Sequence, residues 1–120
     1  MKEAGAVSAL QGIARFTFHE GKLEEFKRLS AQCLEIVRTR DPGTLQYDLY
    51  FNDDQSEAIV LERYTDSQAL IDHLANVAHL MEAILATGTV SGETLGEPSA
   101  ALRAKLADGG VRLFTPYQSM

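Results

Sequence analysis

The spacing of apolar residues changes several times along the chain, and the order of those changes limits the folds that the chain can adopt. Segments in which apolar and polar residues alternate predict β-strands, because successive side chains of a strand point to opposite faces. Segments with an apolar residue every three or four positions predict amphipathic helices. The predicted strands cover residues 9–19, 44–52, 57–64 and 89–97, and the predicted helices cover residues 22–40 and 67–86. The order β-α-β-β-α-β predicts an α+β fold of the ferredoxin-like, split βαβ type.

A chain of 120 residues fits a single domain, so we expect residues 1–120 to form one. Its core is expected over residues 9–97, after a loose lead-in at residues 1–8. Residues 98–115 are predicted to add a short helix and one more strand as a C-terminal extension.

The strands carry apolar residues on both of their faces, which bears on the partner of the chain. Ile59 and Leu61 alternate with Ala58 and Val60. Two helices on one face of a four-stranded sheet would leave the other face bare, and a large exposed apolar face is unusual in a monomer. We therefore predict a homodimer in which two sheets face each other, with the C-terminal strand shielding a sheet edge or reaching the partner.

Composition excludes several classes of protein. The formal net charge is −6 and no cluster of Lys and Arg occurs, so nucleic-acid binding is not expected. The first residues lack the pattern of a signal peptide, and no run approaches the roughly 20 apolar residues of a membrane span, so we expect a cytoplasmic protein without membrane contact. Cys33 is the single cysteine, which excludes an intrachain disulfide and a cysteine-based zinc site; we predict that it is a small core residue.

The segment from Glu62 to His79 contains most of the residues that could perform chemistry. His73 lies on or beside the apolar stripe of its helix, where an imidazole could accept a substrate proton near neutral pH; the alternative is a core histidine with one hydrogen bond. Tyr64 could line a cavity and donate its hydroxyl to a substrate, or could be an ordinary core aromatic residue. Glu62 points to the same strand face as Tyr64 and could bind substrate, orient His73 or balance Arg15.

His79 is six positions after His73, which is about 240° around an ideal helix. The two histidines could meet only if the helix were kinked near Asn76, so we expect no shared metal site. We predict that His79 lies at the rim of a pocket or on the surface. No Walker-type loop, GxGxxG loop or serine–histidine–aspartate order is present, and no cofactor is predicted.

Several short motifs together resemble a known family. Asp41-Pro42-Gly43-Thr44-Leu45, followed by Tyr47, resembles the entry to the second strand in the antibiotic biosynthesis monooxygenase family. Glu62-Arg63-Tyr64, followed by Ala69-Leu70 and His73-Leu74, resembles that family's E-x-(W/Y)…A-L…H signature, and His79 falls where many members have a second histidine. The resemblance covers residues 10–95 and implies a dimeric α/β barrel.

The family resemblance implies several alternative activities. The family includes cofactor-independent quinol and anthrone monooxygenases, an autoinducer-degrading isomerase and heme-degrading oxygenases. The heme-degrading branch has its iron-binding histidine near the position of Ala83 and an asparagine in its first strand. This sequence has neither residue, which disfavours heme degradation.

Three hypotheses about function remain. In the first, the chain is a cofactor-independent monooxygenase that oxidises a small phenol, hydroquinone or anthrone with dioxygen, with His73 as base and Tyr64 bonded to the substrate. In the second, it is an acid/base isomerase of a small hydroxy-carbonyl compound. In the third, it is a non-catalytic dimeric module that binds a small ligand. Glu62, His79 and Arg15 are predicted to bind the substrate.

Overall fold

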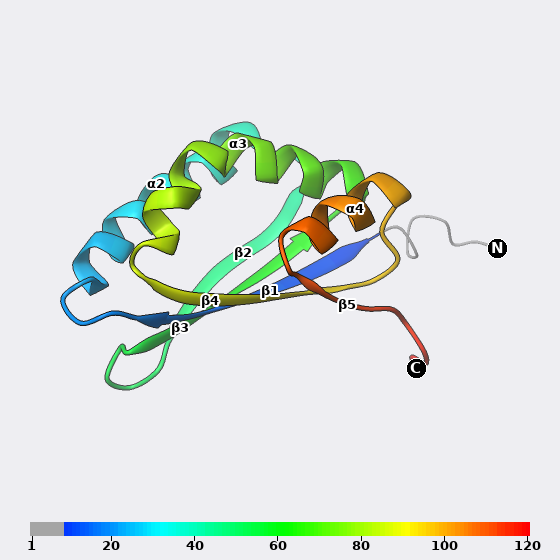
Figure 1. The fold of residues 1–120 in the computed structure, drawn as a ribbon. Helices are drawn as coiled ribbons and strands as arrows, with labels where there is room; N and C mark the ends of the chain where they lie inside the picture. Colours follow the sequence, from blue (N-terminus) through cyan, green and yellow to red (C-terminus); the bar gives the residue numbers. More distant parts are fainter. Residues whose placement is uncertain (1–8) are drawn as a thin grey trace.

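In the computed structural model, residues 9–120 form one five-stranded sheet with its helices on one face (Figure 1). The lead-in predicted for residues 1–8 lies outside the residues that the structure describes. The elements are β1 (Leu10–Phe18), α2 (Leu23–Arg40), β2 (Thr44–Phe51), β3 (Glu57–Tyr64), α3 (Ser67–Leu85), β4 (Gly88–Leu95), α4 (Ala100–Asp108) and β5 (Arg112–Phe114). All predicted strands and helices are present, with ends that shift by at most two residues.

The strands follow the order β2-β3-β1-β4-β5. The first four are antiparallel neighbours, with β1 between β3 and β4, which confirms the predicted ferredoxin-like arrangement. β5 pairs in parallel with β4, and Gly96 N–H donates to the carbonyl of Phe114. The C-terminal strand therefore covers the edge of β4. This agrees with the first of the two predicted alternatives, in which that strand shields a sheet edge.

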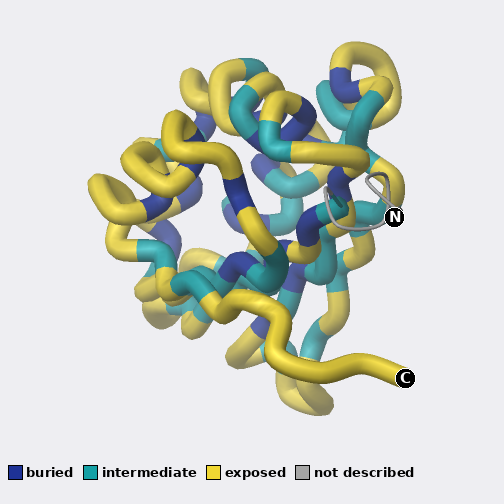
Figure 2. The backbone as a smooth tube through the Cα atoms, turned by 90° about the vertical axis from the view of Figure 1, so that its right-hand side faces the viewer, coloured by how far each residue is buried: buried dark blue, intermediate teal, exposed yellow. Residues whose placement is uncertain are grey.

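Alternation along the strands separates the two faces of the sheet. Ala58 and Val60 are buried beneath the helices, whereas Ile59 and Leu61 point the other way and are partly buried. Figure 2 shows buried positions where the helices and the sheet face each other, and an exposed C-terminal tail. Between α2, α3 and the sheet lies a core cluster, which contains Cys33 as predicted. Its buried members are Leu29, Cys33, Val77, Leu80 and Ile84.

A close contact places the turn after α2 against the start of α3. A Cβ atom at Gly43 would lie 2.5 Å from the Cβ of Ala69, so only glycine allows this approach. Thr65 N–H donates to the carbonyl of Gly43, and the Asp66 side chain caps α3 by accepting a hydrogen bond from Ala69 N–H. The turn that carries Asp41 is thereby held beside the first half of α3.

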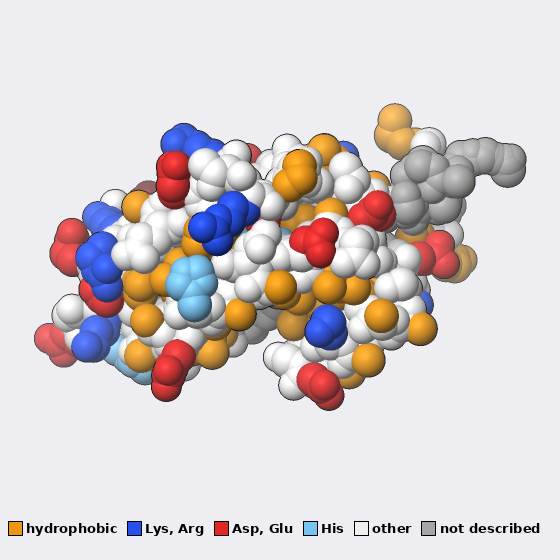
Figure 3. All heavy atoms as spheres, turned by 90° about the horizontal axis from the view of Figure 1, so that it is seen from above, with side chains coloured by type: hydrophobic (Ala, Val, Ile, Leu, Met, Phe, Trp, Pro, Cys, Tyr) orange, Lys and Arg blue, Asp and Glu red, His pale blue; other side chains and the backbone are white. Residues whose placement is uncertain are grey.

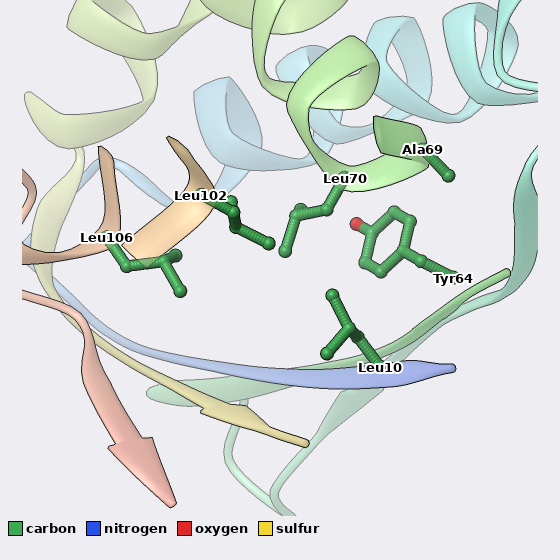
Figure 4. Close-up of a cluster of buried hydrophobic side chains, with 6 residues drawn as sticks. All are labelled: Leu10, Tyr64, Ala69, Leu70, Leu102 and Leu106. Atoms are coloured by element: carbon green, nitrogen blue, oxygen red, sulfur yellow. The ribbon is translucent and has the colours of Figure 1, made fainter. Parts of the chain in front are cut away.

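The short helix α4 completes a second core cluster on the same face of the sheet. Leu102 and Leu106 of α4 pack with Leu10, Tyr64 and Leu70, and Leu102 is fully buried. Figure 4 shows the Tyr64 ring between Leu10 on one side and Ala69 and Leu70 on the other, with the α4 leucines beside them. The C-terminal extension thus contributes to the interior.

Among the helices of residues 9–120, none combines the length and apolar character that a membrane span requires.

Candidate active site

A cavity of about 420 Å³ lies between the sheet and α3 and extends to α4 and the turn that follows it. This volume falls in the range of small-molecule sites. Figure 3 shows the helix face of the molecule, with its outline indented beside the lobe that carries α4. Most of the cavity wall is apolar; the apolar lining includes Phe16, Val60, Leu70, Leu74, Val77, Met81, Leu106 and Val111. Polar side chains are few, and Tyr47, Glu62 and His73 are among them.

His73 belongs to a buried pair with Asp41. Its Nδ1 lies 2.6 Å from Oδ2 of Asp41, and both residues are 5% exposed. Asn76, one turn further along α3, donates from Nδ2 to Oδ1 of Asp41 at 2.6 Å and to the carbonyl of Arg40 at 3.2 Å. Asp41 therefore accepts from both sides and fixes the orientation of the imidazole ring.

The contact with Asp41 determines which nitrogen of His73 is available for chemistry. A neutral imidazole that donates from Nδ1 to a carboxylate has its lone pair on Nε2. Among residues 9–120 no hydrogen bond engages Nε2, and His73 lines the cavity. This arrangement suits a base that accepts a proton from a molecule in the cavity.

Glu62 and Tyr64 form a second polar pair beside His73. The Tyr64 hydroxyl donates to Oε1 of Glu62, and the Tyr64 ring centroid lies 5.6 Å from that of His73. Burial raises the pKa of Glu62, which favours the neutral carboxylic acid, while the Tyr64 bond opposes this shift. Burial likewise raises the pKa of Tyr64, so its hydroxyl keeps its proton and remains a donor.

Tyr47 lies opposite Glu62 across the β2–β3 pair and also contacts His73, with ring centroids 5.6 Å apart. Its hydroxyl is hydrogen-bonded to the thiol of Cys33, and burial raises the pKa of both groups. Cys33 is therefore a neutral thiol in the cavity wall, and Tyr47 is the tyrosine that lines the cavity.

The structure brings His73 and Glu62 into one cavity and places Tyr64 behind Glu62. Tyr64 is fully buried in the cluster beside α4, and its hydroxyl is used by Glu62. The bond from Tyr64 to a substrate stays a prediction. In the structure, Tyr64 holds the carboxyl of Glu62.

The structure does not bring Arg15 and His79 to this cavity, and their contact with a substrate stays a prediction. Arg15 lies on the sheet face without helices, because it alternates with Ala14 and Phe16, and it pairs with Glu93 at 3.7 Å and not with Glu62. His79 is exposed, α3 continues through Asn76, and neither Arg15 nor His79 lines the cavity. The orienting partner of His73 is Asp41, so Glu62 does not have that role either.

Within residues 9–120, no group of three His, Cys, Asp or Glu side chains is arranged to hold a metal ion.

The main site residue that sequence reasoning missed is Asp41. Asp41 precedes Pro42-Gly43 and looked like an ordinary helix end, because aspartate is common in turns. Its contact with His73 spans 32 positions, and no local pattern encodes such a contact. Burial is the property that distinguishes Asp41 from an ordinary turn aspartate, and burial can be recognised only once the fold is known.

Comparison with known proteins supports the resemblance seen in the sequence. The model of the family described as "Antibiotic biosynthesis monooxygenase" matches residues 12–81, which is more than half of the chain. The chain belongs to this antibiotic biosynthesis monooxygenase family. Among curated proteins none matches.

Solved structures share the fold. MupZ from Pseudomonas fluorescens is 27% identical, with a TM-score of 0.84 over 100% of this chain and 94% of its own. Rv0793 from Mycobacterium tuberculosis is 24% identical, with a TM-score of 0.68 over 78% of this chain and 99% of its own. SnoaB, a cofactor-independent oxygenase from Streptomyces nogalater, is 21% identical, with a TM-score of 0.66 over 78% of this chain and 96% of its own.

The site lies within the part of the chain that defines this monooxygenase family. Asp41, Glu62, Tyr64 and His73 all fall inside residues 12–81, whereas the α4 wall of the cavity lies outside that range. The likeness to MupZ also includes the C-terminal extension, since it covers the whole chain.

Proposed function

We propose that this member of the family is a cofactor-independent monooxygenase that oxidises a small phenol, hydroquinone or anthrone with dioxygen. The observation that carries the proposal is the Asp41–His73 pair, whose imidazole lines an otherwise apolar cavity. Membership of the monooxygenase family and the likeness in fold to a cofactor-independent oxygenase support it.

The first step is removal of a proton from the substrate by Nε2 of His73. Asp41 stabilises the imidazolium that forms, because the carboxylate accepts from Nδ1. The electron-rich substrate anion then reduces dioxygen directly, and the apolar cavity limits access of water. With an anthrone, the methylene carbon becomes a carbonyl; one oxygen atom enters the product and the other leaves as water, so no external reductant is needed.

Oxygen uptake on a panel of hydroquinones and anthrones tests this function, with a chelator present. We expect wild-type protein to consume oxygen and His73→Ala to lose at least a hundredfold in kcat, the range for a general base. His79→Ala is the matched control, because His79 is an exposed histidine on the same helix. Equal uptake by wild type and His73→Ala would refute the role of His73.

An isomerase acting on a small hydroxy-carbonyl compound is a second candidate. The specific observation that favours it is Glu62, a carboxyl with a raised pKa in the same cavity as the base. An isomerase needs a proton removed at one atom and returned at another. Turnover of such a compound without oxygen would support the isomerase over the monooxygenase.

We also propose that the chain forms a homodimer through the face of the sheet that lacks helices. Side chains of all five strands contribute to this free face, as the register shows; its apolar members are Ile13, Tyr50, Ile59, Leu61, Leu95 and Phe114. A second copy would present the same apolar face, which suits a symmetric contact.

A further inference from the structure

We propose that Glu62 is a catalytic proton donor that works opposite the His73 base, so that the substrate loses a proton to one residue and gains a proton from the other. This inference rests on the proposed use of His73 as a base, and it applies to both candidate functions. It assigns to Glu62 a role beyond contact with the substrate.

The strand register determines which residues lie beside the Glu62 carboxyl. Glu62 in β3 lies between Gly12 of β1 and Tyr47 of β2. A Cβ atom at Gly12 would lie 3.4 Å from Oε1 of Glu62, which is ordinary van der Waals contact, so the carboxyl lies beside this glycine. The Tyr64 hydroxyl occupies Oε1, which leaves Oε2 as the oxygen that can carry a proton.

Burial outweighs the two groups that stabilise a negative charge on Glu62, the Tyr64 hydroxyl and His73. Among residues 9–120 no lysine or arginine forms an ion pair with Glu62, and the single described hydrogen bond to its carboxyl comes from Tyr64. A carboxylate withdrawn from water needs such partners, and without them the neutral acid is favoured. The titratable groups that line the cavity or act electrostatically on the Glu62–Tyr64 pair are Cys33, Asp41, Tyr47, Tyr64, His73, Glu93 and Lys105.

Of those groups, His73 is the one that can exchange protons with a substrate together with Glu62. Asp41 already accepts from His73 and Asn76, and Lys105 of α4 forms no ion pair among the described residues. The centroid of the His73 ring lies 5.6 Å from the ring centroids of both Tyr47 and Tyr64, and Tyr64 bonds Glu62. The imidazole and the carboxyl therefore flank the same part of the cavity.

In the oxygenation of a methylene group, such as that of an anthrone, Glu62 protonates the leaving hydroxide. After His73 has removed the first C–H proton, dioxygen adds to the carbon and the protonated imidazole returns its proton to the peroxide. His73 then removes the second C–H proton, the O–O bond breaks, and the hydroxide leaves as water with the proton of Glu62. The proton on His73 returns to Glu62 through water, so the methylene and dioxygen yield a carbonyl and one water.

In the isomerisation, the same pair acts without oxygen. His73 removes the proton from the hydroxyl-bearing carbon while Glu62 donates its proton to the neighbouring carbonyl oxygen, which forms an enediol. The substrate class that fits both cases has an acidic C–H or O–H group beside an oxygen atom that must gain a proton.

Infrared spectroscopy of the full chain tests the protonation of Glu62 without any substrate. We expect the carbonyl stretch of a protonated carboxylic acid at neutral pH in wild type, and its loss in Glu62→Gln. Glu57→Gln, an exposed glutamate on the same strand, and Asp41→Asn should both retain the band. A spectrum without this band, or a band that persists in Glu62→Gln, would overturn the proposal.

Kinetic measurements distinguish this inference from the proposed function. They use the aerobic or the anaerobic assay, according to which one gives turnover. We expect Glu62→Gln to lower kcat about a hundredfold with little change in KM and to remove the alkaline fall of the pH profile, while Glu62→Asp restores part of the rate. If His73→Ala abolishes turnover but Glu62→Gln retains it, the base role stands and the role of Glu62 fails.

Discussion

Two carboxyl groups lie near one imidazole in this site, and their environments give them different tasks. Asp41 accepts hydrogen bonds from His73 and Asn76, which hold it beside the imidazole. Among residues 9–120, Glu62 accepts from Tyr64 alone, and burial raises the pKa of Glu62. The difference in donors therefore separates an orienting carboxylate from a carboxylic acid that can donate a proton.

The raised pKa of Glu62 predicts a dependence of stability on pH. Below its ordinary value of 4.5, Glu62 is protonated in both the folded and the unfolded chain. Above that value the unfolded chain releases the proton while the folded chain retains it, so the free energy of unfolding falls as pH rises, until the folded pKa is passed. We expect this decrease in the free energy of unfolding with pH to be absent in Glu62→Gln.

Melting temperatures in buffers from mildly acidic to mildly alkaline would measure this effect as the difference between wild type and Glu62→Gln. The melting temperature of Glu62→Gln, relative to that of wild type, should increase as pH rises. Glu57→Gln controls for the loss of an exposed carboxylate on β3. Parallel melting curves for wild type and Glu62→Gln over the whole range would contradict a raised pKa.

At the scale of elements, α4 has a larger role than its sequence indicates. Its apolar residues form no strong stripe, yet Leu102 and Leu106 enter the cluster that surrounds Tyr64 (Figure 4). Tyr64 holds Glu62, and α4 also forms part of the cavity wall. A short helix outside the repeated βαβ pattern thus supports a residue of the candidate site.

We expect Leu102→Ala to lower the free energy of unfolding by about 2–5 kcal/mol, the range for truncation of a fully buried leucine. Denaturant unfolding monitored by circular dichroism would measure the change. Leu45→Ala is the matched control, because Leu45 is 55% exposed and its truncation should cost far less. Equal losses for the two variants would mean that α4 does not stabilise the core.

The elements were predictable because their signals are local, whereas the site depends on contacts between elements. Alternation over β3 and the Asp66 cap of α3 can be read from neighbouring residues. The bond from the Tyr64 hydroxyl to Glu62 depends on packing beside α4, which no neighbouring residue in the sequence indicates. Asp41 was missed for the same reason, since its partner lies 32 positions away.

At the scale of the whole molecule, the sheet has one covered face and one face that no described helix covers (Figure 1). Ile59 and Leu61 of β3 lie at its centre, with Ile13 opposite Leu61 on the neighbouring strand. Burial of such side chains stabilises association by about 25 cal/mol per Å² of apolar surface. The salt bridges of Glu93 with Arg15 and Arg112 also lie on this face, which would place charged pairs among the apolar contacts of a dimer.

Leu61→Arg should therefore convert a homodimer into a monomer, because two copies would bring unpaired guanidinium groups into the apolar centre of the contact. Sedimentation velocity at micromolar protein concentration measures the change in mass. Ala75→Arg adds the same charge on the exposed side of α3 and should leave the dimer intact. A wild-type chain that sediments as a monomer would refute the dimer. A Leu61→Arg variant that stays dimeric would move the contact to another surface, and the apolar side chains of the free face would then need a different partner.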